Sequence, residues 1–211
     1  MKFTHRQLCE IAAKWLKRSN SANGHGCHIA IVEAACYGEN PDVIGFRHGL
    51  GYDCGSVVLE IKTSRADFFV DRNKPHRQDG CGMGKWRYYV CPTDLISPNE
   101  LPCGWGLVYV NKQGHIKIIC GAMFKSNRFG YFELKQNHYI WQNFNYNAVK
   151  EISLLAMALN RLTDVEDMLY LQRELNKSNS KLTTIEHELF KTKELLKLSE
   201  YRLSRSNFGG V

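Results

Sequence analysis

The chain has 211 residues, of which 44% are hydrophobic and 23% charged, a composition that excludes a wholly disordered protein and allows one domain with an appendage. Its net charge is +7, and because residues 164–205 hold eight basic and eight acidic side chains, the whole excess lies in residues 1–163. A basic domain favours a polyanionic partner such as nucleic acid, although some proteins of similar pI bind none.

The cysteines and the apolar runs bear on the compartment. None of the eight cysteines are spaced as Cys-x-x-Cys and several lie in apolar runs, so we expect reduced cysteines rather than disulfides or zinc. That pattern favours a cytoplasmic protein. No signal peptide is evident, and no run approaches the roughly 20 apolar residues of a membrane span, so no membrane partner is expected.

The chain begins with a predicted helix and a predicted strand. Thr4 can cap the helix, and apolar residues recur at helical spacing from Leu8 to Leu16. Residues 27–34 then form a strand candidate that leads to Pro41-Asp42.

Two apolar runs around the glycine-rich residues 48–55 predict a hairpin. Because side chains alternate along a strand, Glu60 and Lys62 are predicted to point to one face, about 7 Å apart at their Cα atoms, and Ile61 to the other. If Asp42, just before the first of these strands, turns toward the same face, two carboxylates and an ammonium converge.

The next segment predicts a helix, a loop and a strand. Residues 63–72 resemble a short helix capped by Ser64, with Asp67 placed for a capping box. Residues 73–84 carry three glycines and predict a mobile loop. A strand over residues 85–92 follows, ended by a proline.

A hairpin over residues 106–119 completes the order helix, three strands, short helix, strand, hairpin, which predicts an α/β fold with a mixed sheet flanked by helices. Residues 121–146 show no clean period, and their structure stays open. A helical pattern returns at residue 147, with five apolar positions expected to pack on the sheet: Val149, Ile152, Leu155, Ala156 and Leu159.

Beyond residue 163 the pattern becomes a heptad. One position of the repeat is always apolar: Met168, Leu175, Leu182, Leu189, Leu196 and Leu203. The sequence therefore predicts a domain over residues 1–163, a coiled-coil helix over 164–205 that forms a parallel homodimer through 168–203, and a disordered tail over 206–211. Because Ser and Thr occupy several of the intervening positions, a single solvated helix, or one folded back on the domain, stays open as an alternative.

The converging acids predict a metal site. Mg²⁺ prefers oxygen ligands, usually one or two carboxylates with several waters, so Asp42 and Glu60 with the backbone carbonyl of Ile61 are candidate ligands, and Mn²⁺ is expected to substitute. An ion there lowers the pKa of bound water and neutralises charge on a phosphate, as phosphodiester hydrolysis requires. Lys62 can stabilise that phosphate or position the attacking water.

Pro41-Asp42 and Glu60-Ile61-Lys62 together resemble the signature of the PD-(D/E)XK nuclease superfamily. The run from Lys62 to Phe68 closely resembles the Lys-x-Ser-Arg-Ala-Asp-Phe motif of a small bacterial and phage branch associated with DNA repair, and the similarity spans roughly residues 25–160. The resemblance implies a restriction-endonuclease-like core with a mixed four-stranded sheet, Asp42 and Glu60 as metal acids and Lys62 as the catalytic lysine. Members often add an acid from the first helix, for which Glu10 is the candidate and Glu33 a competitor.

Residues around these acids are candidates for DNA contact. Seven are expected to reach phosphates: Ser64, Arg65, Lys74, His76, Arg77, Lys85 and Arg87. Trp86, Tyr88 and Tyr89 can stack on unpaired bases, although alternation along a strand places at least one of them, most naturally Trp86, in the core.

The resulting prediction is a Mg²⁺-dependent deoxyribonuclease that acts in DNA repair or in phage or host DNA processing. Two alternatives stay open. In one, the same fold is a non-catalytic module that binds DNA or recruits repair proteins. In the other, the coiled coil carries the function and the domain serves as its scaffold. RNA cleavage is a weaker variant of the first prediction.

Overall fold

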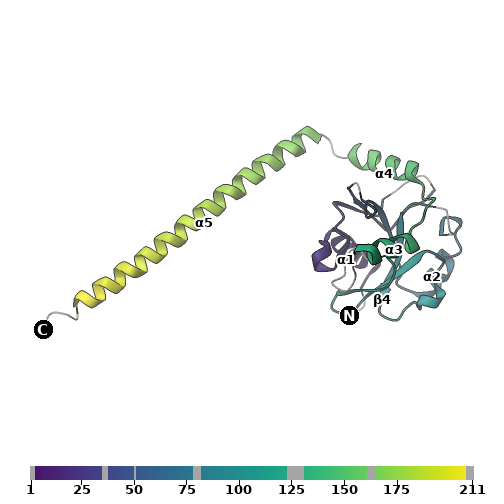
Figure 1. Ribbon diagram of the computed structural model, residues 1–211, viewed down its shortest axis with the longest axis horizontal. Coiled ribbons are helices and arrows are strands. Elements are labelled where there is room, and N and C mark those ends of the chain that lie inside the picture. Colours follow the sequence, from purple (N-terminus) through teal and green to yellow (C-terminus); the bar gives the residue numbers. More distant parts are fainter. Residues whose placement is uncertain are drawn as a thin grey trace. The chain divides into compact units, whose positions relative to one another are not determined.

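The computed structural model describes residues 3–34, 38–49, 51–77, 82–122, 131–160 and 165–207, and the statements below concern these ranges. The chain divides into two compact units, Met1–Ala158 and Leu159–Val211 (Figure 1). The division lies five residues before the predicted boundary at residue 163. Each unit is described by itself.

The first unit is built on one mixed sheet of six strands in the order β1-β2-β3-β4-β5-β6. The strands β1 to β3 are antiparallel, β3, β4 and β5 run parallel, and β6 is antiparallel to β5. Their bounds are Ile29–Val32, Val43–Arg47, Gly55–Ile61, Trp86–Pro92, Trp105–Val110 and Ile116–Cys120. The α/β prediction is confirmed, with six strands where the resemblance implied four.

Helices cover both faces of this sheet (Figure 1). In chain order they are α1 (His5–Lys17), α2 (Arg65–Asp71), α3 (Tyr131–Trp141) and α4 (Ala148–Asn160), with 3₁₀ turns at Asn20–Ala22, Pro75–Arg77 and Pro98–Glu100. The predicted cap of α1 is confirmed, because Thr4 and Gln7 exchange side chain-to-backbone hydrogen bonds in a capping box. Helix α3 lies in the segment whose structure the sequence left open.

The alternation of strand side chains sorts the core into two layers. Val57, Leu59 and Ile61 of β3 pack with α1 on one face, whereas Val58 packs with Phe68 of α2 on the other. Glu60 and Lys62 follow the parity of Val58, so they lie on the α2 face, opposite Ile61. The predicted separation of Ile61 from this pair is therefore confirmed.

Gly106 in β5 marks a close approach within the sheet. A Cβ built on it would collide with the ring of buried Tyr88 and lie 2.7 Å from the carbonyl oxygen of Cys120. We expect Gly106→Ala to lower the free energy of unfolding by about 1–3 kcal/mol, because the core must open to admit the methyl group. Urea denaturation of both proteins measures this, and a change below about 0.5 kcal/mol would contradict it.

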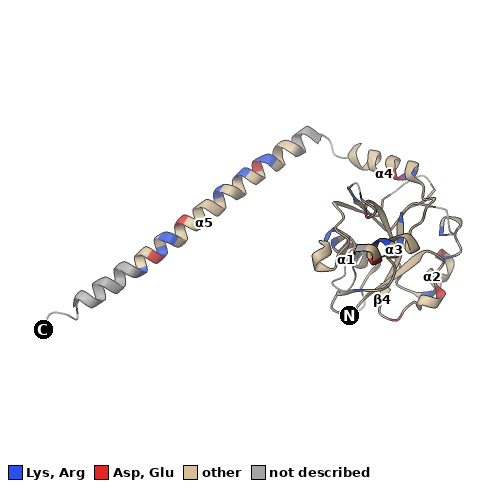
Figure 2. Ribbon diagram, in the orientation of Figure 1, with Lys and Arg blue, Asp and Glu red and all other residues tan. Residues whose placement is uncertain are grey.

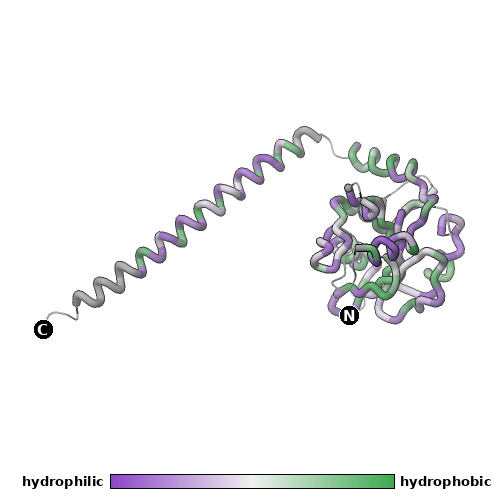
Figure 3. Tube along the Cα trace, in the orientation of Figure 1, coloured by the Kyte–Doolittle hydropathy of each residue, from purple (hydrophilic) through white to green (hydrophobic). Residues whose placement is uncertain are grey.

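Helix α4 packs by a different face from the one its apolar residues predicted. Leu154 and the carboxylate of Glu151 are buried, whereas Val149 is 74% and Ile152 67% exposed. Figure 3 shows the hydrophobic colouring that runs along much of this helix. The prediction that Val149, Ile152 and Leu159 pack on the sheet is wrong, since Glu151 satisfies polar groups inside the domain and turns the apolar stripe outward.

The second unit contains α5 (Val165–Asn207), a helix of 43 residues. Among its described side chains, Leu175, Leu182 and Leu189 are 60%, 57% and 52% exposed, and acidic and basic residues are interspersed along it (Figure 2). The long helix is as predicted, and it includes the first two residues of the predicted tail, whose remainder lies outside the described ranges. Within those ranges, no helix has both the length and the apolar character needed to cross a bilayer.

Candidate active site

Asp42 lies at the end of the sheet where β3 finishes. The register that pairs Val43 with Leu59 brings Asp42 beside the last residues of β3, and its Oδ2 accepts the backbone N–H of Ile61 at 2.7 Å. The Asp42 side chain is 21% exposed. Its charge contributes to the raised pKa of Glu60, so the two acids are electrostatic neighbours, as the sequence predicted.

Glu60 and Lys62 are buried, at 2% and 4% exposure. The Lys62 Nζ lies 3.7 Å from Glu60 Oε2 and 3.4 Å from Asp71 Oδ1. Glu60 Oε2 also lies 2.7 Å from the Arg77 guanidinium, whereas Glu60 Oε1 has no hydrogen-bond partner among the described residues. The structure therefore brings the predicted acid and lysine together inside the domain rather than on an open strand face.

Arg77 is the centre of a buried ionic cluster that the sequence did not predict. Its Nε and Nη2 donate to the two oxygens of Asp71, at 2.9 and 3.2 Å, and its Nη1 lies 3.9 Å from Glu39. Asp71 also pairs with Lys74 at 2.8 Å and accepts the Tyr89 hydroxyl at 3.1 Å. Three buried acids, Glu39, Glu60 and Asp71, and two buried bases, Lys62 and Arg77, therefore meet here.

Burial and charge shift the pKa values of these groups in opposite directions. Burial raises the pKa of Glu60 to about 8 against the opposing charge of Arg77, with Asp42 and Asp71 adding to the rise. Burial alone would also raise the pKa of Asp71, but its hydrogen bond and charge interaction with Arg77 hold that pKa well below its usual range. The two acids therefore differ in their readiness to give up a proton.

His5, the first residue of α1, contacts Asp42. His5 Nε2 lies 3.4 Å from Asp42 Oδ2, and His5 Nδ1 lies 3.6 Å from the Cys9 thiol. Burial, followed by the charges of Asp42 and Glu33, raises the pKa of Cys9 to about 12, so this thiol is a packing group and not a nucleophile.

The two candidates for an additional acid differ in position. Glu10 is exposed and pairs with Arg6 at 3.5 Å. Glu33 is also exposed, but its backbone N–H donates to the Asp42 carbonyl at 2.8 Å, which places it at the same sheet end as Asp42. The position of Glu33 is the better suited, and the role of either acid stays a prediction.

Two of the seven predicted DNA contacts are corrected by the structure. Arg77 and Arg87 are each 2% exposed and flank the ring of Trp105, at 5.3 and 5.0 Å from its centroid. Buried guanidiniums cannot reach a phosphate, so for these two residues the prediction was wrong. Their charges are used inside the fold, where burial requires that they be paired.

The other five predicted contacts keep some exposure. Ser64 caps α2, and Arg65 donates to Glu100 Oε2 at 3.1 Å. The Lys85 ammonium donates to the carbonyls of Tyr52 and Cys54, at 2.9 and 2.7 Å, which directs it inward. The other two are Lys74, whose side chain is 47% exposed, and half-buried His76. Burial and the neighbouring cations lower the pKa of His76 to about 4. DNA contact by these five residues stays a prediction.

The three aromatic residues of β4 do not reach the surface. Trp86, Tyr88 and Tyr89 are all 0% exposed. Trp86 is in the core, as expected, but base stacking by either tyrosine is ruled out in this fold.

Much of the predicted mobile loop is also held in place. Glu39 accepts the N–H of Met83, and Glu151 accepts the N–H of Gly84 at 2.8 Å and the Ser56 hydroxyl at 2.6 Å. Residues 78–81 lie outside the described ranges. Two buried acids from distant segments therefore fix the described end of the segment.

A groove of about 640 Å³ lies at the carboxyl ends of the parallel strands β3 and β4. Three chain segments line it, namely Phe3–His5, Thr63–Arg65 and Pro92–Leu95. His5 links this groove to Asp42, and Thr63 follows Lys62 directly. Crevices at this end of α/β sheets are common ligand sites. The groove is lined by neighbours of Asp42 and Lys62, whereas Asp42, Glu60 and Lys62 are not among its described lining residues.

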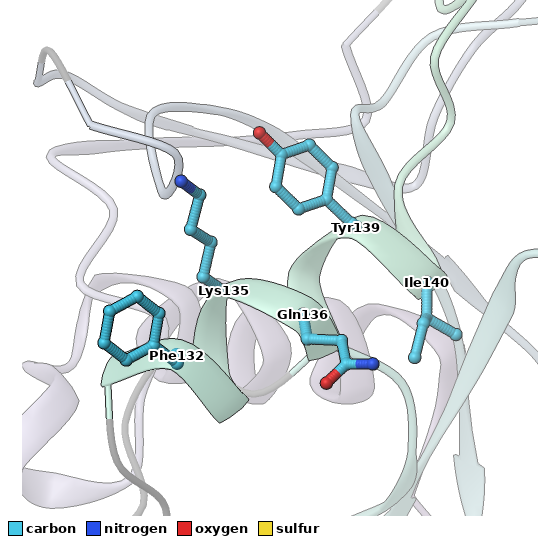
Figure 4. Close-up of a pocket in the computed structure, with 5 residues that line it drawn as sticks. All are labelled: Phe132, Lys135, Gln136, Tyr139 and Ile140. Atoms are coloured by element: carbon cyan, nitrogen blue, oxygen red, sulfur yellow. The ribbon is translucent and has the colours of Figure 1, made fainter.

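A second hollow lies on α3 and is chemically different (Figure 4). Five residues of this helix line about 430 Å³: Phe132, Lys135, Gln136, Tyr139 and Ile140. None of these five lining residues carries a carboxylate, so they do not offer the oxygen ligands of a metal site.

The donor set at Asp42 and Glu60 fits a hard divalent cation. Within the described ranges no three His, Cys, Asp or Glu side chains gather as a site made of protein ligands alone requires. Mg²⁺ does not need such a site, because it keeps several waters and commonly binds one or two carboxylates with a substrate phosphate. Glu60 Oε1 is buried and receives no hydrogen bond from any described residue, so it is an oxygen that an ion can satisfy.

Sequence reasoning missed Asp71, Glu39 and His5, and it gave Arg77 a different role. Only Asp71 had a local signal, since it follows Asp67 by four residues and therefore shares its helix face. The others come from segments that only the tertiary fold brings to the strand.

Comparison with known proteins adds little. No family model matches the chain, and no curated protein sequence matches it significantly. A solved structure described as SPO1766, a protein of unknown function from Silicibacter pomeroyi, is similar at 19% identity over 79% of this chain and 96% of that chain, with a TM-score of 0.41. We rest no functional argument on this similarity. The fold and site define an α/β protein with a mixed sheet and a buried acid–base cluster at one end of it.

Proposed function

We propose that this protein is a metal-dependent DNA nuclease of the PD-(D/E)XK class with a restriction-endonuclease-like core. The observation that carries the proposal is the meeting of Asp42, Glu60 and Lys62 at one sheet end, where one buried Glu60 oxygen has no hydrogen-bond partner in the described part of the chain. The basic charge of residues 1–163 suits a DNA substrate.

Each residue has a role in this proposal. Asp42 and Glu60 would hold Mg²⁺ or Mn²⁺, with the carbonyl of Ile61 as a further ligand. The bound ion would supply an activated water and neutralise phosphate charge. Lys62, held between Glu60 and Asp71, would stabilise the phosphate as its negative charge grows. The groove beside His5 and Ser64 would receive the DNA strand.

A cleavage panel tests the function. Purified full-length protein is incubated with single-stranded, duplex, branched and modified DNA, and with RNA, in Mg²⁺, Mn²⁺ or EDTA. We expect at least one DNA form to be cut with metal and none in EDTA. Metal-dependent cutting of RNA alone would indicate a ribonuclease instead. If no substrate is cut, the proposed nuclease activity is contradicted.

One observation favours the non-catalytic alternative. The Arg77 guanidinium lies 2.7 Å from Glu60 and already supplies a positive charge there. A module that binds DNA or recruits repair proteins would need nothing more at this position. DNA binding that is equally tight in Mg²⁺ and in EDTA, without cleavage of any substrate, would support that reading.

We further propose a cytoplasmic homodimer that acts in DNA repair or in phage or host DNA processing. The buried thiols of Cys9, Cys27 and Cys91 suit a reducing compartment. The heptad leucines whose side chains the structure describes, Leu175, Leu182, Leu189 and Leu196, are more than half exposed on α5. A parallel partner helix would bury them, as in other coiled coils.

Leu182→Asn combined with Leu189→Asn is expected to convert the dimer to a monomer, because two polar residues would enter the proposed seam. Sedimentation at micromolar concentration measures the mass. Leu169→Asn, the same change at an exposed position outside the heptad leucines, is the control and should stay dimeric. A wild-type monomer, with its mass state unchanged by deletion of residues 165–211, would disprove the dimer.

A further inference from the structure

The Arg77 guanidinium, which lies beside Glu60, is itself held by a second acid, Asp71. Arg77 uses Nε and Nη2 to clasp both oxygens of Asp71, and the same Nη2 lies 2.7 Å from Glu60 Oε2. The Arg77 carbonyl accepts the Trp105 indole N–H at 3.0 Å, and the guanidinium lies over the Trp105 ring. Both ends of Arg77 are therefore fixed, at 2% exposure.

This arrangement treats the two oxygens of Glu60 differently. Arg77 and Lys62 both approach Oε2, whereas Oε1 is buried with no hydrogen-bond partner among the described residues. A buried carboxylate that is not held can rotate to share its oxygens among nearby cations. With Oε2 occupied by a fixed guanidinium, that rotation is blocked and Oε1 stays available.

We infer that Arg77 is a positioning residue: anchored by Asp71, it holds Glu60 Oε2 so that Oε1 is presented to a divalent cation. The inference rests on the proposed metal-dependent function and assigns to Arg77 a role other than DNA contact. Groups that orient the ligands of a metal contribute about 10–100-fold to its affinity. The fork of an arginine, which a lysine lacks, is the feature that the geometry uses.

The test is Mn²⁺ binding to the full-length protein, measured by calorimetric titration without DNA. Arg77→Lys keeps the charge but loses the fork, so we expect the Kd for Mn²⁺ to rise about tenfold or more. Arg72→Lys is the matched control. Arg72 lies five residues earlier, and its guanidinium lies over the Phe69 ring and donates to the Glu100 carbonyl at 3.4 Å, so its replacement should leave the Kd within about twofold.

A second charge-preserving variant guards against misfolding. Asp71→Glu moves the anchor of the guanidinium without changing the net charge and should also weaken Mn²⁺ binding. Near-ultraviolet circular dichroism confirms that each variant is folded at the titration temperature. The measured quantity is the Mn²⁺ affinity of folded protein. If Arg77 and Asp71 only stabilised the fold, variants that remain folded would keep the wild-type affinity.

The outcomes separate the two proposals. Folded Arg77→Lys or Asp71→Glu protein that binds Mn²⁺ as tightly as wild type, or more tightly, overturns the positioning role. Tighter binding would identify Arg77 as a competitor of the ion. If such a variant still cuts DNA with metal, only the positioning inference fails, whereas wild-type protein that neither binds Mn²⁺ nor cuts DNA overturns both proposals.

Discussion

Lys62→Met is expected to slow DNA cleavage by about 10²–10³-fold without weakening Mn²⁺ binding. The ammonium of Lys62 is placed beside Glu60 and Asp71, where it can stabilise charge that develops on the phosphate, and loss of one such group typically has this effect on the rate. Methionine keeps the buried apolar stem and removes only the charge. Removing a cation from an acidic site does not reduce its attraction for a metal.

Asp42→Asn is the companion variant, and it should lose both cleavage and metal affinity because a candidate ligand is changed. Single-turnover cleavage and Mn²⁺ titration of the same preparations separate the two effects. Lys117→Met removes an exposed cation of β6, outside this cluster, and serves as the control, with cleavage within a few fold of wild type. Full activity of Lys62→Met would refute the role assigned to this lysine.

The stability of the metal-free protein is expected to fall by roughly 1–2 kcal/mol between pH 6.5 and 8. The pKa of Glu60 is raised by burial to about 8 in the folded state, far above its ordinary value. The folded protein therefore binds this proton through the whole interval, and the unfolded chain does not. Stability from this group is complete below the unfolded pKa and is lost as the pH rises through the folded pKa.

Two histidines offset part of this fall. The pKa of His76 is lowered to about 4 and that of buried His25 is also lowered, so the unfolded chain still loses protons from these imidazoles just above their ordinary pKa of 6.5, whereas the lowered pKa of Asp71 acts at more acid pH. Urea denaturation in EDTA at pH 6.5, 7.2 and 8 measures the slope, and Glu60→Gln should remove most of it. A rise in stability over this interval would show that Glu60 is ionised in the folded protein.

Local patterns predicted several elements well. Thr4 capped its helix and Ser64 capped another because a cap depends on a few consecutive residues. The strand that contains Glu60 and ends just before Lys62 was predicted, with Ile61 on the opposite face, because alternation is a property of any strand. The approach of Asp42 to this strand also followed, since a hairpin joins neighbours in sequence.

Long-range packing accounts for the errors. The stripe of α4 that includes Val149 and Ile152 had helical spacing, yet Glu151 faces inward because Ser56 and Gly84 require its carboxylate. Arg77 was assigned to DNA because arginines in polar loops are usually solvated. Its burial depends on Asp71, Glu60 and Trp105, which no local pattern connects.

The sequence by itself determined the α/β class, the long C-terminal helix and the presence of two acids and a lysine at neighbouring strand ends. These follow from periodicity and short-range geometry, which act over a few residues. Only the tertiary structure decided that Glu60 is buried, that Arg77 holds one of its oxygens, and that His5 reaches Asp42. Burial and charge pairing depend on which distant segments share a space, and that is fixed when the helices pack on the sheet.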